Sequence, residues 1–95
     1  MNKQLETFIQ TYLHLEQAYD TRGYLRPTLM AFDKSYVQQV REGLSQVLRE
    51  RSLSIEDYER LSDIEFPGDE SLYEYLQSMY AYLFEDRPDQ PTPPE

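Results

Sequence analysis

The chain has 95 residues, of which 18 are Asp or Glu and 9 are Lys or Arg, giving a net charge of −9 at neutral pH. This length accommodates one domain with a modest hydrophobic core, and the absence of cysteine excludes disulfides, thiol nucleophiles and cysteine-ligated metals. The acidic balance disfavours direct binding to nucleic acid or to acidic membrane surfaces, and no run of about 18 apolar residues is present to span a bilayer.

The charge is distributed unevenly along the sequence. Residues 1–49 contain six Lys or Arg and five Asp or Glu, whereas residues 50–95 contain three Arg and thirteen Asp or Glu. The second part therefore carries a net charge of −10, which favours either a basic partner or simple solubility. The N-terminus, MNKQLETF, lacks the apolar core of a signal peptide, and the simplest prediction is a cytoplasmic protein.

The first predicted helix covers residues 3–20. Gly23, shortly after it, is expected to terminate the helix. Its apolar residues recur at helical spacing: Leu5, Phe8, Ile9, Tyr12, Leu15 and Tyr19. His14 projects from the opposite face toward solvent, and as the single histidine it is a poor catalytic base or metal ligand. Residues 21–34 break the pattern but are apolar enough to fold over the core, and Pro27 suits the first turn of a short helix over residues 28–32.

The second predicted main helix covers residues 35–51, with Ser35 and Gln38 matching a capping box. Its buried stripe consists of Val37, Val40, Leu44, Val47 and Leu48. Gly43 costs about 1 kcal/mol relative to alanine in a helix interior. It either permits close approach of another helix or is a surface glycine of no consequence.

A third, shorter helix is predicted over residues 54–62, with Ser54 as its N-cap. Glu56, Glu59 and Asp63 sit at i, i+3 and i+7, and therefore form one acidic ridge. The ridge is either a solvated face or a surface that meets the lysines and arginines of a partner.

The fourth predicted helix covers residues 70–85, after a turn at Pro67-Gly68 and with Asp69 as the N-cap. Its aliphatic side chains form one narrow stripe: Leu72, Leu76, Met79 and Leu83. Two pairs of tyrosines flank the stripe, one pair on each edge: Tyr73 with Tyr80, and Tyr75 with Tyr82. The arc is wider than a helix packed on one side needs, so the tyrosines either close the rim of a bundle or form a binding surface.

The last nine residues, RPDQPTPPE, contain four prolines and no other apolar residue. We therefore expect residues 87–95 to be a disordered or polyproline-like tail that is dispensable for folding. Strand-type alternation is nowhere sustained. The prediction is an all-α fold: a single small bundle of about four helices in residues 1–86, followed by the disordered tail.

Motifs for catalysis or cofactor binding are missing from the sequence. It contains no phosphate-binding glycine-rich loop, no G-x-S-x-G and no H-E-x-x-H. Carboxylate pairs occur at i, i+4, Glu70 with Glu74 and Glu59 with Asp63, but chance produces such pairs in so acidic a chain. We expect a protein that is not an enzyme, with no cofactor and no metal, and binding to another protein is favoured over catalysis.

The chain resembles the small α-helical immunity proteins of bacterial contact-dependent growth inhibition. The residues that carry the likeness are Leu5, Phe8, Tyr12, Leu13 and His14, which are similar to an aromatic "YFH"-like stretch near the start of one such family. The likeness loosely covers residues 3–85. The family tends to continue with an acidic-Trp pair, whereas this chain continues with Leu15-Glu16-Gln17 and has no tryptophan. The resemblance implies toxin neutralisation as the general role and assigns no individual residue.

Together with the acidic composition, the resemblance implies a small acidic inhibitor that binds and neutralises a basic toxin domain, which we expect to be a nuclease. The alternatives are a nucleic-acid mimic that inhibits a DNA-binding defence enzyme, and a helical adaptor whose tail carries the recognition. The oligomeric state is left open. The residues expected to contact the partner are carboxylates that steer it and tyrosines that anchor it: Glu56, Glu59, Asp63, Asp69, Glu70, Tyr73, Glu74, Tyr75 and Tyr82.

Overall fold

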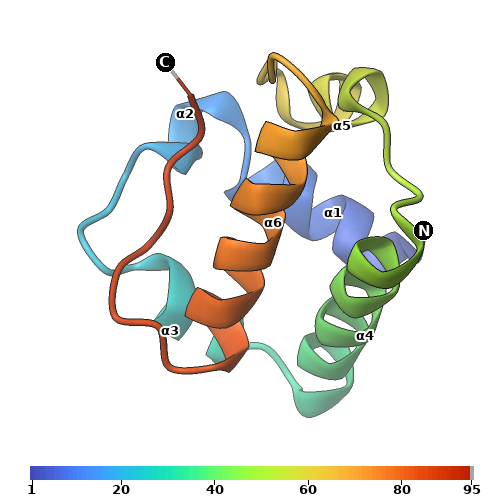
Figure 1. Cartoon of the computed structure of the whole chain (residues 1–95). Helices are drawn as coiled ribbons and strands as arrows, with labels where there is room; N and C mark the ends of the chain where they lie inside the picture. Colours follow the sequence, from blue (N-terminus) through green and yellow to red (C-terminus); the bar gives the residue numbers. More distant parts are fainter. Residues whose placement is uncertain (95) are drawn as a thin grey trace.

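The computed structural model describes residues 1–94, and within them the regular structure is entirely α-helical (Figure 1). The helices are α1 (Lys3–Tyr12), α2 (Leu15–Ala18), α3 (Leu25–Met30), α4 (Lys34–Glu50), α5 (Ile55–Ser62) and α6 (Asp69–Phe84). Helix α4 packs against α1, α3 and α6, and α5 closes against α1. The all-α prediction is confirmed, but residues 1–94 contain six helices instead of about four, because the first predicted helix is split in two and a short helix forms at Leu25–Met30. In the described part of the chain, no helix combines the length and the apolar character needed to cross a membrane.

The helix predicted over residues 3–20 is split into α1 and α2. His14 has extended backbone geometry, and its Nδ1 accepts a hydrogen bond from the Glu16 N–H, so it caps α2. The break changes which side chains are buried. Leu13 and Ala18 enter the core, whereas Leu15 and Tyr19, expected in the buried stripe, are exposed. Gly23 does not end the helix; it lies in the following turn with φ +96°, a conformation that favours glycine.

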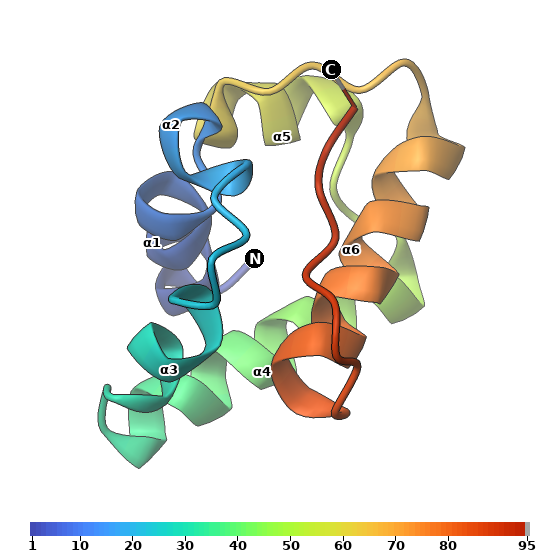
Figure 2. The same ribbon diagram turned by 90° about the vertical axis from the view of Figure 1, so that its left-hand side faces the viewer.

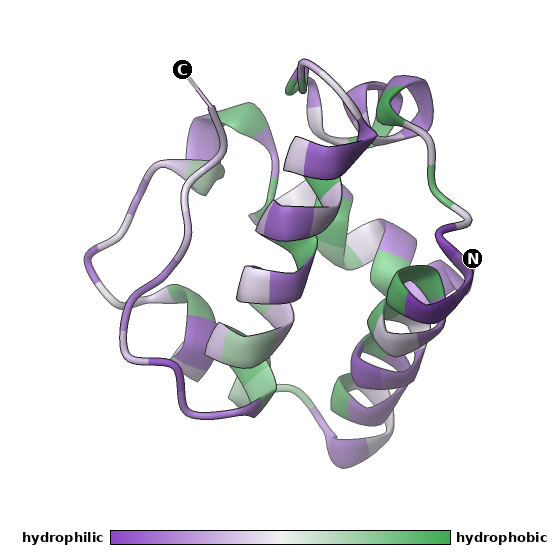
Figure 3. Cartoon of the chain, viewed as in Figure 1, coloured by the Kyte–Doolittle hydropathy of each residue, from purple (hydrophilic) through white to green (hydrophobic). Residues whose placement is uncertain are grey.

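Helix α4 begins one residue earlier than predicted, and its cap is different. Asp33 is the N-cap, and its carboxylate accepts a hydrogen bond from the Tyr36 N–H at 2.9 Å, so the predicted capping box of Ser35 and Gln38 does not form. The sequence offered two acceptable caps two residues apart. Around the helix axis, hydrophobic and hydrophilic stretches alternate, as the colouring in Figure 3 shows, and Val40, Leu44 and Val47 are buried.

Gly43 is the point of close approach between α1 and α4. The Asn2 side chain caps α1 by accepting the Leu5 N–H at 2.8 Å, and its amide nitrogen donates to the Gln39 carbonyl on α4 at 2.7 Å. A Cβ on Gly43 would overlap that amide group. Of the two interpretations of this glycine, close helix approach is the one that the structure supports.

Helices α5 and α6 meet through a short loop that is firmly packed. The predicted N-cap Ser54 is confirmed, since its hydroxyl accepts the Asp57 N–H at 3.0 Å. At the other end of α5, the buried Ser62 hydroxyl donates to the Tyr58 carbonyl and accepts the Ile64 N–H. The N-cap of α6 is Gly68, and the predicted cap Asp69 is instead the first helical residue, without a side-chain capping bond.

Helix α6 is buried over a broad arc, because several different parts of the chain cover it. The predicted stripe is confirmed, with Leu72, Leu76, Met79 and Leu83 all buried. On one edge, the Tyr73 hydroxyl donates to the Leu53 carbonyl and accepts the Leu53 N–H, both at 2.9 Å. On the other edge, Tyr75 packs against Phe66 with ring centroids 5.3 Å apart. The wide arc is therefore accounted for by contacts within the chain.

The C-terminal segment is extended and lies against the body, which corrects the prediction of a disordered tail. Residues 87–94 run back along α6, between it and the side of the molecule formed by α2 and α3 (Figures 1 and 2). Pro93 is buried, and the Tyr19 hydroxyl donates to the Pro94 carbonyl. The prediction treated the segment as having no apolar surface to bury, although proline rings are themselves apolar. Glu95, the last residue of the predicted tail, lies outside the described residues.

Candidate protein-binding surface

The carboxylates predicted to contact a partner gather at one end of the molecule. Residues 56–74 contain eight Asp or Glu and a single Arg. They form α5, the loop that follows it and the first turns of α6, at the top of Figure 1. We call this surface the acidic end. Its exposed carboxylates are Glu56, Glu59, Asp63, Glu65, Asp69, Glu70 and Glu74. All six carboxylates predicted from the sequence are in this set, and Glu65 joins them.

Neutralisation of the acidic end within the described chain is slight. Arg60 pairs with Asp57 at 2.9 Å, which lowers the pKa of that carboxyl group. Arg51 approaches Glu70 at 4.0 Å, a contact in which the Glu70 side chain stays fully exposed. The remaining six exposed carboxylates have no ion-pair partner among residues 1–94. Such a cluster produces a negative field that attracts basic molecules from a distance.

The predicted ridge on α5 is shorter than expected. Glu56 and Glu59 lie on the helix, but the helix ends at Ser62, and Asp63 caps it with a left-handed backbone at φ +63°. Asp63 therefore leaves the helical register on which the ridge was based. It lies instead beside Glu65 at the edge of a hollow.

The tyrosines predicted as anchors are core residues, which corrects their assignment as an exposed binding edge. Tyr73, Tyr75 and Tyr82 are 6%, 5% and 4% exposed. Tyr73 is held by its two hydrogen bonds to Leu53, and Tyr82 lies beneath the Arg26 guanidinium, 4.1 Å from its ring centroid. In the folded protein these rings have almost no surface to offer a partner. The helical spacing of the tyrosines was read correctly, but spacing does not reveal which other segments cover an edge.

Exposed apolar residues lie beside the acidic end, in a place that the sequence did not indicate. Leu15 and Tyr19 are 43% and 38% exposed. Together with the α5–α6 loop and the end of the tail they line an open hollow of about 450 Å³, which we call the α2–α5 hollow. Its full lining is Leu15, Tyr19, Asp63, Ile64, Glu65, Pro67 and Pro94.

The α2–α5 hollow combines an apolar floor with two carboxylates. This combination suits an arginine or lysine side chain, whose aliphatic part packs on apolar surface while its charged end meets carboxylate. An aromatic ring such as Tyr19 adds favourable contact with a guanidinium group. The exposure of Leu15 and Tyr19 could have been predicted from the sequence only by recognising that His14 interrupts the helix, because an unbroken helix places both residues in the core.

A second group of exposed apolar side chains lies on the opposite part of the fold. Phe32, before α4, stacks on Tyr36 with ring centroids 4.4 Å apart and meets the edge of Tyr12 at 6.1 Å. Met30 is also exposed there. These rings pack mainly on one another.

Side chains suited to metal binding are not brought together in the structure. Among residues 1–94, no three His, Asp or Glu side chains are close enough to hold a metal ion. His14, expected to face solvent, is half-buried as the cap of α2. Comparison of the chain with protein-family models, with curated proteins and with solved structures finds no match.

Proposed function

We propose that this protein is a non-enzymatic inhibitor that binds a basic protein partner through its acidic end. The observation that carries the proposal is the set of six exposed carboxylates without an ion-pair partner, gathered on α5, the loop after it and the start of α6. A surface whose charges have one sign accelerates association with a partner of opposite charge and disfavours partners of like charge.

The resemblance to immunity proteins suggests the class of partner. Those proteins neutralise a toxin domain, often a basic nuclease, inside the cell that makes both. The positive charge of a basic nuclease is complementary to the negative charge of the acidic end. We therefore propose a toxin domain as the partner and neutralisation by complex formation as the mode of action.

The α2–α5 hollow supplies the anchor that the buried tyrosines do not. We propose that an arginine or lysine of the partner enters it, with its charged group between Asp63 and Glu65 and its aliphatic part against Leu15. Exposed carboxylates then govern the association rate, and the hollow governs dissociation. Contacts inside a desolvated hollow contribute about 2 kcal/mol or more when they form a hot spot, far more than contacts at an exposed rim.

The test uses a pair of variants with equal net charge. One neutralises the acidic end with Glu56→Gln, Glu59→Gln and Asp63→Asn. The matched control carries Glu42→Gln, Glu85→Gln and Asp86→Asn, which are exposed and lie away from the acidic end. Wild type and control should capture the same basic protein from the native host, and the acidic-end variant should not.

The captured protein is then purified and its activity is titrated with each variant. Stoichiometric inhibition by wild type, weakened in the acidic-end variant and in Leu15→Ala, supports the proposal. If all three variants inhibit equally while remaining folded, the acidic end is not the binding surface.

Nucleic-acid mimicry is a second candidate, because the same unpaired carboxylates resemble a row of phosphates. A mimic competes directly with DNA for its target, and its binding weakens steeply with salt. An immunity protein that binds away from the active site leaves DNA binding intact. Measuring whether a short DNA duplex displaces the protein from the captured partner distinguishes the two.

A further inference from the structure

The surface against which residues 87–94 lie has the features of a peptide-binding groove. Residues 87–94 cross it as an extended chain without helix (Figure 2). Polar side chains of the body hold the chain near both ends. Arg26 donates to the Arg87 carbonyl at 2.5 Å, and the Tyr19 hydroxyl donates to the Pro94 carbonyl at 2.5 Å. Both contacts are made to backbone carbonyls, which any extended segment can provide.

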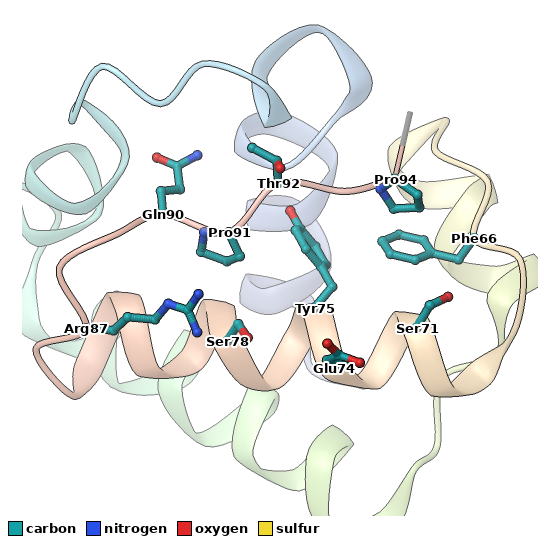
Figure 4. A pocket seen from close by; sticks show the side chains of 10 residues that line it. All are labelled: Phe66, Ser71, Glu74, Tyr75, Ser78, Arg87, Gln90, Pro91, Thr92 and Pro94. Carbon is teal, nitrogen blue, oxygen red and sulfur yellow. The ribbon is translucent and has the colours of Figure 1, made fainter.

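The aromatic lining of this groove is suited to binding proline. Aromatic rings of Tyr75 and Phe66 line the space between α6 and the segment, together with Pro91 and Pro94 (Figure 4). Aromatic grooves recognise proline-rich segments because such segments are already extended, and therefore lose little conformational freedom on binding. The buried Pro93 shows that this groove takes a proline ring out of water.

The chain's own segment fills the groove incompletely. An open space of about 510 Å³ remains between it and α6, lined also by Ser71, Glu74 and Ser78. The Tyr75 hydroxyl and the Gln90 side-chain oxygen are both buried at this place, and neither makes a hydrogen bond of good geometry with residues 1–94. Buried polar groups without partners cost free energy. A different segment that offers an acceptor to Tyr75 can therefore bind this groove more favourably than residues 87–94 do.

We propose that the groove between α6 and the α2–α3 side is a binding site for an extended proline-rich segment of a partner protein, with residues 87–94 acting as its intramolecular competitor. The groove and the acidic end recognise different groups of a partner. The groove binds backbone carbonyls and proline rings, whereas the acidic end attracts positive charge. The two surfaces adjoin at Glu74, a carboxylate of the acidic end that also lines the groove, and at Pro94, which lines both the groove and the α2–α5 hollow.

The direct test removes the competitor. The protein is truncated after Asp86, its fold is checked by circular dichroism, and a fluorescent peptide of sequence RPDQPTPPE is titrated into it by anisotropy. We expect saturable binding to the truncated protein. Binding to the full chain should be about tenfold weaker or worse, because a tethered segment competes at an effective concentration in the millimolar range.

Two controls establish specificity. A peptide with all four prolines replaced by alanine should lose binding, because it is no longer pre-extended. Tyr19→Phe in the truncated protein should weaken binding several-fold, because it removes the donor to the Pro94 carbonyl while keeping the ring. A folded truncated protein that does not bind the peptide overturns the proposal, as does equal binding of the alanine peptide.

A second variant covers the case in which the truncated protein does not fold. The full chain with Pro93→Ala keeps its segment but holds it less tightly, while the groove itself is unchanged, so it should bind the peptide more strongly than wild type. Equal binding by the two folded full-length proteins overturns the proposal. So does a full-length dimer that dissociates on truncation, since the occupant would then be the tail of a second copy.

Discussion

At the scale of single residues, Gly43 and Asn2 form the most specific contact in the helix packing. Alanine in place of glycine should stabilise a helix interior by about 1 kcal/mol. Here its methyl group would displace the Asn2 amide, which caps α1 and bonds to the Gln39 carbonyl. Losing the cap costs about 1 kcal/mol, and losing the bond to Gln39 costs a similar amount. We therefore expect Gly43→Ala to lower the free energy of unfolding by up to about 1 kcal/mol.

The same substitution should have the opposite sign once Asn2 is removed. In an Asn2→Ala background nothing opposes the methyl group, so Gly43→Ala should stabilise the protein by about 1 kcal/mol. Urea denaturation of the four proteins of this cycle measures the coupling. Equal effects of Gly43→Ala in the two backgrounds would show that Asn2 moves aside without cost.

Tyr58 and Tyr75 give the protein a predicted sensitivity to alkali. They meet edge to face with ring centroids 6.4 Å apart, and burial raises the pKa of both phenols. The unfolded chain titrates near the ordinary tyrosine pKa of about 10. Between that pH and the raised pKa values, unfolding releases protons. Stability is therefore constant below about pH 10 with respect to these groups and falls as the pH rises further.

The corresponding measurement is the free energy of unfolding between pH 8 and pH 11. Tyr75→Phe should flatten the alkaline decline and leave stability at pH 8 equal or higher, because its hydroxyl makes no hydrogen bond of good geometry with residues 1–94. Tyr24→Phe is the matched control, since Tyr24 is exposed and should leave the decline unchanged. If the free energy of unfolding still declines at alkaline pH in both Tyr75→Phe and Tyr58→Phe, other groups cause the decline.

At the scale of elements, the tail acts as a packed part of the fold. Truncation after Asp86 exposes the space lined by Tyr75 and Phe66, leaves Tyr19 without its carbonyl partner, and leaves Arg26 with only the Tyr82 carbonyl. Each such hydrogen bond contributes about 1 kcal/mol, so we expect the truncated protein to lose about 1–3 kcal/mol of stability. Urea denaturation measures the loss, with Tyr19→Phe in the full chain as the smaller, single-contact comparison. An unchanged midpoint would restore the sequence-based view of a dispensable tail.

The helices show how far sequence patterns lead. The stripes of α4 and α6 were predictable, because each depends on residues within one helix. Two other features were not. His14 interrupts the first helix although the apolar spacing continues through it, and the tail, which directly follows α6, folds back along the Tyr75 edge of that helix. The carboxylates of the acidic end are exposed, as their charge predicts, although Asp63 leaves the ridge expected on α5. The anchors were misplaced, because burial of tyrosine depends on tertiary packing that spacing does not encode.

At the scale of the whole molecule, charge acts over a distance comparable to its size. The molecule measures 33 × 27 × 21 Å along its principal axes and carries a net charge of −9. Electrostatic screening lengths are about 30 Å at 0.01 M salt and about 8 Å at 0.15 M. At low salt every carboxylate of the acidic end therefore repels the others. At physiological salt the repulsion is confined to close neighbours, and the acidic end acts on a partner only at short range.

This repulsion makes a prediction about stability that needs no partner. Folding brings the carboxylates of residues 56–74 together, whereas the unfolded chain lets them separate. The free energy of unfolding should rise by up to about 1 kcal/mol between 0.01 M and 0.15 M sodium chloride. The rise should shrink in the variant with Glu56→Gln, Glu59→Gln and Asp63→Asn, and shrink less in the control with Glu42→Gln, Glu85→Gln and Asp86→Asn. Stability that falls with salt would mean that the pairs of Arg51 with Glu70 and Arg60 with Asp57 outweigh the repulsion. The acidic end would then be internally balanced, and the electrostatic attraction to a basic partner on which the proposed function rests would be weaker than the count of carboxylates suggests.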